Sequence, residues 1–183
     1  MNIVTESYLR DAARRRSLNE DIRMFSDSRN TTSFDVFLSH NFADREIVAG
    51  IYNGLHELGL KVYVDWIVDP QLNRQNVTKE SAELIRSRMA SSKSLIYAFS
   101  VHSDASKWMP WELGYVDGNV HRCAILPIAQ VSTVNFVRTE YLKLYPLISE
   151  NIDIFTNQTR LVLQETETSA NRRSIKDWIG GRL

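Results

Sequence analysis

The strongest constraint on the fold is an alternation of short apolar runs with segments of helical periodicity. Four apolar runs have the length of a strand: 34–40 (FDVFLSH), 60–65 (LKVYVD), 94–100 (SLIYAFS) and 123–129 (CAILPIA). Between them, apolar residues recur every three or four positions, as in amphipathic helices. Strands that alternate with helices predict an α/β fold, in which a parallel sheet carries helices on both faces.

The helices are predicted over 43–58, 78–89 and 106–119, and a closing helix is expected at 169–183. A fifth strand is expected at 152–155 (IDIF). Five parallel strands connected in this way favour the flavodoxin-like sheet order 2-1-3-4-5.

The chain divides by composition into an extension and a main domain. Residues 4–25 are predicted to be a charged helix with sparse apolar positions, and 26–33 (SDSRNTTS) are polar. We interpret 1–32 as an N-terminal helical extension and linker, and 33–183 as the main domain. A chain of 183 residues is long enough for one such domain with its own core.

Charge and hydropathy argue against two classes of partner. Lys plus Arg and Asp plus Glu both number 22, so the formal net charge is zero. A nucleic-acid binder that depends on a strong positive field is therefore not expected, and we interpret Arg14 to Arg16 as a solvated helix face. No run approaches the roughly 18 apolar residues of a membrane helix, and the N-terminus lacks the apolar centre of a signal peptide.

Cysteine and histidine usage argues against a disulfide framework and a metal site. Cys123 is the single cysteine, and the chain has four histidines. One cysteine cannot form an intramolecular disulfide, which suits a reducing compartment, and scattered histidines with one cysteine match no metal-ligand pattern. We therefore expect a cytoplasmic protein without a bound metal.

Polar residues follow the first and third predicted strands, where an α/β sheet of this order binds ligands. Ser39 and His40 follow the first strand, and Ser100 follows the third. Trp108 and Glu112 are four residues apart on the next predicted helix, so they share one helix face. We expect these side chains to line one crevice.

These residues, taken in order, resemble a TIR (Toll/interleukin-1 receptor) domain over roughly 33–128. The resemblance is carried by FDVFLSHNFAD, GLKVYVD, LIYAFS and SKWMPWELG, and most sharply by the first strand and by the W-x-x-x-E pattern from Trp108 to Glu112. Met109 stands where several relatives have cysteine, and Pro110 is unusual inside the motif.

The resemblance implies the five-stranded flavodoxin-like fold and an NAD+-cleaving activity. Many bacterial and plant TIR domains break the N-glycosidic bond of NAD+ and release nicotinamide, and some cyclise the remaining ADP-ribose to a second messenger in anti-phage systems such as Thoeris. By resemblance, Glu112 matches the catalytic glutamate and Trp108 an aromatic that contacts the nucleotide. The other candidates for substrate binding, at strand ends and in the loop after the second strand, are Ser39, His40, Asp65, Trp66 and Ser100.

The resemblance also implies partners. NAD+ is a substrate, so no cofactor is expected, and an effector protein would sense the product. The loop 65–77 corresponds to one that packs against a neighbouring protomer, which predicts self-association. The alternatives are a non-catalytic TIR scaffold that acts by self-association and a transferase that processes nucleosides. The identity of the product stays open between linear, cyclic and conjugated ADP-ribose.

Overall fold

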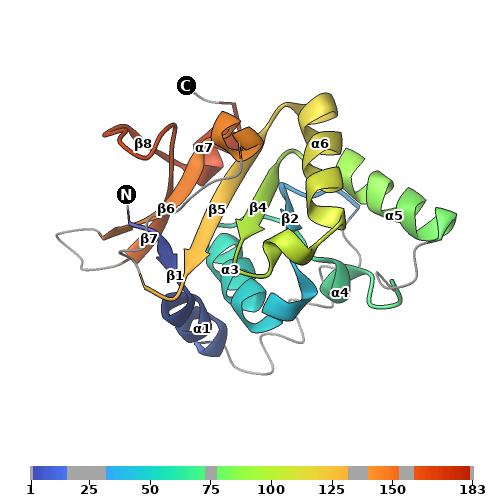
Figure 1. The fold of residues 1–183 in the computed structure, drawn as a ribbon, viewed down its shortest axis with the longest axis horizontal. Coiled ribbons are helices and arrows are strands. Elements are labelled where there is room, and N and C mark those ends of the chain that lie inside the picture. Colours follow the sequence, from blue (N-terminus) through green and yellow to red (C-terminus); the bar gives the residue numbers. More distant parts are fainter. Residues whose placement is uncertain (1, 16–31, 73–77, 132–139, 153–158, 182–183) are drawn as a thin grey trace.

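The apolar runs form the parallel centre of one sheet in a computed structural model that describes residues 2–15, 32–72, 78–131, 140–152 and 159–181 (Figure 1). The central strands are β2 (Val36–Ser39), β3 (Val62–Tyr63), β4 (Leu95–Phe99), β5 (Cys123–Ala129) and β6 (Leu147–Ile152). Their order is β3-β2-β4-β5-β6, and all four pairings are parallel. This confirms the predicted order 2-1-3-4-5. Every residue of β2 is buried, as expected for a strand that is covered on both faces.

The sheet has three strands beyond the five that were predicted. β7 (Thr159–Gln164) and β8 (Arg172–Ser174) extend it in antiparallel fashion, and β1 (Val4–Thr5) pairs with the end of β5. The fifth parallel strand was predicted at 152–155, but β6 already begins at Leu147. Of the predicted range, 153–155 lie outside the described residues. The strand contains polar residues, so the search for apolar runs did not detect it. One of them, Ser149, can be buried because its hydroxyl donates a hydrogen bond to the Gln164 side chain at 3.1 Å.

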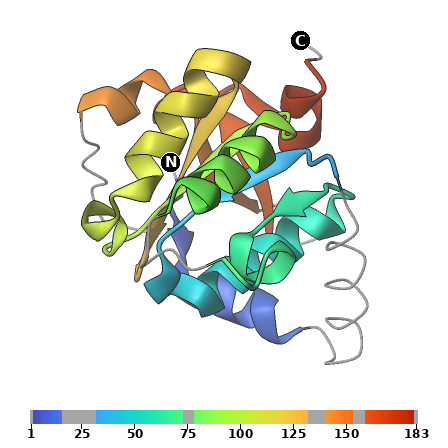
Figure 2. The same ribbon diagram turned by 90° about the vertical axis from the view of Figure 1, so that its right-hand side faces the viewer.

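The main helices follow the predicted positions and cover both faces of the sheet. They are α3 (Arg45–Glu57), α5 (Lys79–Ala90) and α6 (Trp108–Val120). Thr78 caps α5 in a reciprocal capping box with Ser81. Figure 2 shows α5 and α6 on one face of the sheet and α3 on the other. The prediction of helices on both faces is therefore confirmed.

Two segments differ from their predicted form. The loop after β3 begins with a one-turn helix, α4 (Asp65–Val68), which is too short to produce a helical apolar pattern. The closing helix is confined to α7 (Ile175–Ile179), because 172–174 pair with β7 as β8. Three short 3-10 turns complete the described elements: η1 (Phe42–Asp44), η2 (Ser103–Ala105) and η3 (Glu140–Leu144).

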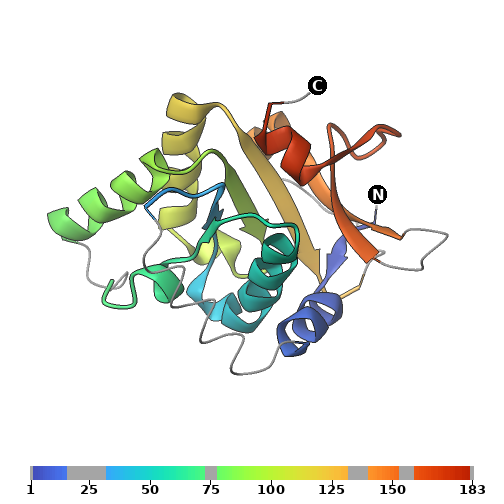
Figure 3. The same cartoon turned by 180° about the vertical axis from the view of Figure 1, so that it is seen from behind.

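The N-terminal segment packs on the main sheet and on α3. α1 (Glu6–Arg14) begins after β1, where the Thr5 hydroxyl accepts a hydrogen bond from the Tyr8 amide at 3.3 Å. α1 lies alongside α3 (Figure 3), and a Cβ atom built on Gly50 would be only 1.9 Å from the Leu9 carbonyl oxygen. The helix predicted over 4–25 is thus a short strand and α1 in its described part, and 16–25 lie outside the described residues.

Candidate functional site

The site is built where β2 and β4 end side by side. These strands are parallel neighbours, with Ser39 opposite Tyr97, so the loops that follow them leave from the same edge of the sheet. α6 begins after the loop that follows β4. The topology therefore brings the strand ends and the Trp108–Glu112 motif together, as the sequence predicts.

Glu112 is a buried carboxylate held by the end of β2. It lies on the inner face of α6 beside the buried Leu113 and Met109, with 0% of its surface exposed. The Ser39 hydroxyl, also 0% exposed, donates a hydrogen bond of 2.6 Å to Glu112 Oε2. Because a buried carboxylate is costly without donors, this contact helps α6 to keep a charged residue against the sheet.

Aromatic rings run along α6 beside this carboxylate. Trp108 and Trp111 meet edge to face with ring centroids 5.4 Å apart, and Tyr115 continues the row 6.2 Å from Trp111. Trp111 is 38% exposed, whereas Glu112 points inward. The aromatic rings of α6 therefore offer flat apolar surfaces, of which Trp111 is exposed, whereas the Glu112 carboxylate is on the buried side of the same helix.

His40 and Asp65 form a second buried pair next to Ser39. His40 Nδ1 lies 2.8 Å from the Leu38 carbonyl oxygen, and Nε2 lies 3.3 Å from Asp65 Oδ1. Asp65 also accepts the Trp66 amide at 2.8 Å, and the Arg45 guanidinium lies 4.7 Å from the Trp66 ring centroid. The predicted residues His40, Asp65 and Trp66 thus form one connected group.

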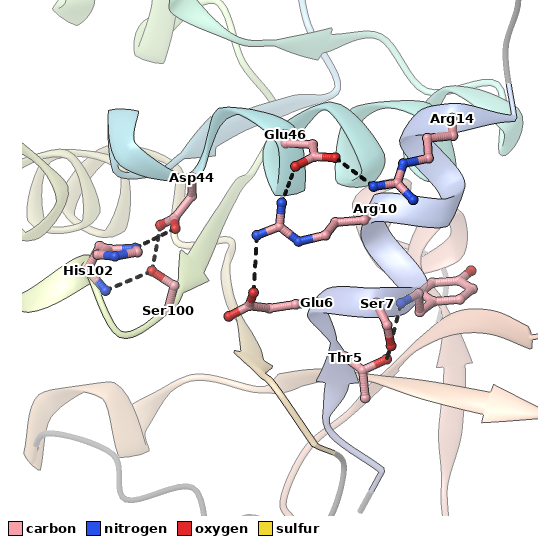
Figure 4. A network of polar contacts seen from close by, with 10 residues as sticks. Thr5, Glu6, Ser7, Arg10, Arg14, Asp44, Glu46, Ser100 and His102 are labelled. Atoms are coloured by element: carbon pink, nitrogen blue, oxygen red, sulfur yellow. Dashed lines mark hydrogen bonds and ion pairs between the residues drawn. The ribbon is translucent and has the colours of Figure 1, made fainter.

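Ser100 belongs to a network that ties the loops after β2 and β4 together (Figure 4). Its hydroxyl donates to the buried Asp44 at 2.5 Å, and His102 Nδ1 contacts the other oxygen of Asp44 at 2.6 Å. The His102 amide donates back to Ser100 Oγ at 3.0 Å, and Asn41 donates to the His102 carbonyl at 2.7 Å. Sequence reasoning missed Asp44, because a carboxylate just before a helix reads as an ordinary helix-start residue.

A second missed residue is Asp69, which anchors the segment after α4. Both of its carboxylate oxygens accept hydrogen bonds from Arg88 of α5 at 2.8 Å, and Tyr63 donates to it at 3.0 Å. The Asp69 carboxylate raises the pKa of Arg88. This pairing fixes the described start of the predicted 65–77 loop, of which 73–77 lie outside the described residues.

An open cleft of about 820 Å³ lies against these groups. Its described lining residues are His40, Asn41, Phe42, Ala82, Arg86, Ala105, Ser106, Lys107, Trp108 and Trp111. His40 and Trp108 are the predicted site residues among them. Ser39 adjoins His40 in the chain and Glu112 is one helical turn from Trp108, so the buried Ser39–Glu112 pair adjoins two residues of the cleft lining.

The described ranges give no support for a metal site or a membrane segment. Within them, no group of three or more His, Cys, Asp or Glu side chains is arranged to hold a metal ion. None of their helices is long and apolar enough to cross a membrane.

Comparisons with known proteins find similar sequences and similar solved structures. The chain is 42% identical over 147 residues to the "Probable 3' cyclic ADP-D-ribose synthase ThsB'" of Bacillus cereus (strain MSX-D12), which covers 80% of this chain and 75% of that protein. It is 29% identical over 87 residues to the "Putative cyclic ADP-D-ribose synthase TIR2" of Cytobacillus dafuensis, which covers 47% of this chain and 23% of that protein.

Among solved structures, the TIR domain of the Toll-related receptor TRR-2 from Hydra magnipapillata matches with a TM-score of 0.45 and 20% identity. That match covers 60% of this chain and 78% of the other. No family model matches the chain.

Proposed function

The chain belongs to the TIR-domain family that includes the Bacillus cereus protein, and from this premise we propose that it is an NAD+-consuming cyclic ADP-ribose synthase. It would cleave the bond between nicotinamide and ribose in NAD+ and close the remaining ADP-ribose into a cyclic product. The product would signal to an effector protein in the cytoplasm as part of anti-phage defence. The observation that carries this proposal is the buried Glu112, which Ser39 holds by a hydrogen bond one helical turn from Trp108 of an aromatic-lined cleft.

The proposed reaction needs one carboxylate and no acid. When the bond from ribose C1′ to the pyridinium nitrogen breaks, both bonding electrons leave with nicotinamide, which departs as a neutral molecule. Positive charge then develops on the ribose, and the Glu112 carboxylate stabilises it electrostatically. A nucleophile of ADP-ribose itself then bonds to C1′ and releases its proton to solvent, whereas water in that place would give linear ADP-ribose and likewise release a proton. Because one charge suffices, the paired carboxylates of a glycosidase are not required.

The remaining predicted site residues have supporting roles in this proposal. Trp108 and Trp111 offer flat faces for the nicotinamide or adenine ring. The connected group of His40, Asp65 and Trp66 shapes the site at the ends of β2 and β3. Ser100 fixes the loop after β4 through its hydrogen bond to Asp44. Since Glu112 is closed off from solvent in the described conformation, the wall that His40 and Trp108 form must open for the ribose to reach it.

The test is to incubate the concentrated protein with NAD+ and to separate the products by chromatography. Glu112→Gln serves as the matched variant, because the glutamine oxygen still accepts the Ser39 hydrogen bond while the charge is lost. We expect nicotinamide release to fall about 100- to 1000-fold in the variant. Equal turnover in both proteins would remove Glu112 from the mechanism. No nicotinamide from the wild type, with or without an added crowding agent, would favour the scaffold alternative.

A further inference from the structure

Two cations, Arg86 and Lys107, line the cleft, and neither forms an ion pair with a described acidic residue. Arg86 comes from α5 and Lys107 from the residue just before α6, so they belong to two different elements. Among the described residues, neither has an acidic partner within ion-pair distance, and the described lining of the cleft contains no carboxylate. Nearby cations on the same helix differ, since Lys79 is 3.8 Å from Glu83 and Arg88 is paired with Asp69.

Unpaired cations that face a shared concave space attract anions. Like charges repel each other, and a cleft with low-dielectric walls concentrates their field on whatever enters it. The aromatic residues of the same cleft, Phe42, Trp108 and Trp111, bind flat rings instead. The cleft therefore combines recognition of negative charge with recognition of rings, and its volume of about 820 Å³ is within the range of small-molecule sites.

We propose that Arg86 and Lys107 bind the diphosphate of a dinucleotide and thereby select an intact dinucleotide over its nucleoside half. This inference rests on the proposed function and names the part of the substrate that two residues recognise. Glu112 is one helical turn from Trp108 and bonded to the neighbour of His40, so the reacting ribose belongs at the part of the cleft that His40 and Trp108 line. The diphosphate, which separates the two nucleosides of the substrate, then extends toward the two cations.

The first experiment compares two substrates that share the bond to be broken. NAD+ carries the diphosphate, whereas nicotinamide riboside has the same nicotinamide–ribose bond and no phosphate. Loss of one charge-assisted contact in Arg86→Gln or Lys107→Gln should lower the ratio of kcat/KM for NAD+ to kcat/KM for the riboside about 10-fold. The double variant should lower it further, and its kcat/KM for NAD+ should depend less on added salt.

Lys79→Gln is the matched control. It removes one positive charge from the same helix, but Lys79 is 82% exposed, is paired with Glu83 and does not line the cleft. It should leave the substrate ratio unchanged. An equal fall in the ratio for Lys79→Gln would mean that the overall charge of the helix matters and would overturn the proposed contact. Because Arg86 and Lys107 are both exposed, their variants are expected to keep the wild-type melting temperature.

A binding measurement separates failure of this inference from failure of the proposed function. ADP-ribose is titrated calorimetrically into Glu112→Gln, and into Glu112→Gln combined with Arg86→Gln or Lys107→Gln. Weaker binding with the added substitutions supports the cation pair even if no variant, nor the wild type, releases nicotinamide. Equal affinity in all three proteins, or no affinity in any, overturns the inference whatever the turnover result.

Discussion

At the scale of single residues, the hydrogen bond from Ser39 to Glu112 fixes the position of the carboxylate in the site. Both side chains are 0% exposed, and the donor and acceptor oxygens are 2.6 Å apart. Ser39 therefore acts in this structure through the carboxylate and has no surface of its own to offer a substrate. We infer that it is a positioning residue, which fixes the carboxylate where positive charge would develop.

Ser39→Ala should lower kcat more than it changes KM. Removing the donor takes one hydrogen bond from a buried carboxylate, which should lower the free energy of unfolding by about 1–3 kcal/mol, and should lower kcat about 10-fold. Initial rates over a range of NAD+ concentrations, with urea unfolding in parallel, check both effects. The matched control is Ser94→Ala, because the buried Ser94 donates to the Asp35 carbonyl at 2.7 Å, away from Glu112. If Ser94→Ala lowers kcat as much, Ser39 has only a structural role.

Cys123 should not react with iodoacetamide while the protein is folded. It is 4% exposed, and burial, with a smaller contribution from the Asp117 charge, raises the pKa of its thiol to about 12. The thiolate is the reactive form, so almost none is present at neutral pH. Mass spectrometry after alkylation should find the unmodified thiol in native protein and complete modification in concentrated guanidinium. Rapid alkylation of the native protein would contradict both the burial and the raised pKa.

Long-range partners explain which site residues the sequence could reveal. Glu112 and Trp108 lie four residues apart on one helix, so a local pattern finds them. Asp44 meets Ser100 across 56 residues, and Arg86 and Lys107 line one cleft only because α5 and the start of α6 both border it. Residue type alone does not distinguish such residues from the many charged side chains that are solvated. These residues can be recognised as parts of the site only when the order of the strands in the sheet is known, because that order decides which elements lie next to each other.

At the scale of elements, the contact between α1 and α3 depends on the missing side chain of Gly50. A Cβ atom there would be 1.9 Å from the Leu9 carbonyl oxygen, which is backbone and cannot rotate away. The helices could accommodate an alanine only by separating. Their remaining contacts include ion pairs of Arg10 and Arg14 with Glu46, which are exposed and contribute little to stability (Figure 4).

Gly50→Ala should therefore displace α1, and Gly54→Ala should not. The first substitution should lower the free energy of unfolding by about 1–3 kcal/mol through overpacking. Gly54 is one turn later on the same helix, where an added Cβ would meet only the Leu161 Cδ1 atom at 3.9 Å. That variant should gain roughly 0.5–1 kcal/mol, because alanine is the better helix former. Urea unfolding of both variants, with proteolysis of the N-terminal segment, gives the comparison; equal stabilities would mean that α1 is not docked as described.

Element prediction succeeded where strands are buried on both faces and failed at the edges of the sheet. β2, β4 and β5 are continuous apolar runs, because helices cover them on both sides. β8 has the sequence RRS and no buried residue, so no pattern marks it as a strand. β1 has two residues and exists through its pairing with Ile128 and Ala129. Such strands are defined by their neighbours, which a single sequence does not show.

At the scale of the whole molecule, one copy of the chain holds its candidate catalytic carboxylate away from solvent. Glu112 has no exposed surface, while exposed apolar side chains stand around the mouth of the cleft, with Phe42 at 57% and Trp111 at 38% exposure. The formal net charge of zero adds little repulsion between copies. These features favour an enzyme that becomes active when copies associate, and we propose the 65–77 segment as one of the contacts.

Specific activity should therefore rise with protein concentration at a fixed concentration of NAD+. The sharper form of this experiment adds Glu112→Gln to dilute wild-type protein. The variant should contribute about 100- to 1000-fold less turnover of its own but keep the surfaces through which copies associate. An excess of it should therefore raise the activity of the dilute wild type toward that of the concentrated enzyme. An equal mass of serum albumin controls for crowding and for adsorption to the vessel. Constant specific activity over the dilution series, together with no response to Glu112→Gln, would mean that each copy opens its own cleft, and that the wall formed by His40 and Trp108 moves without help from a neighbour.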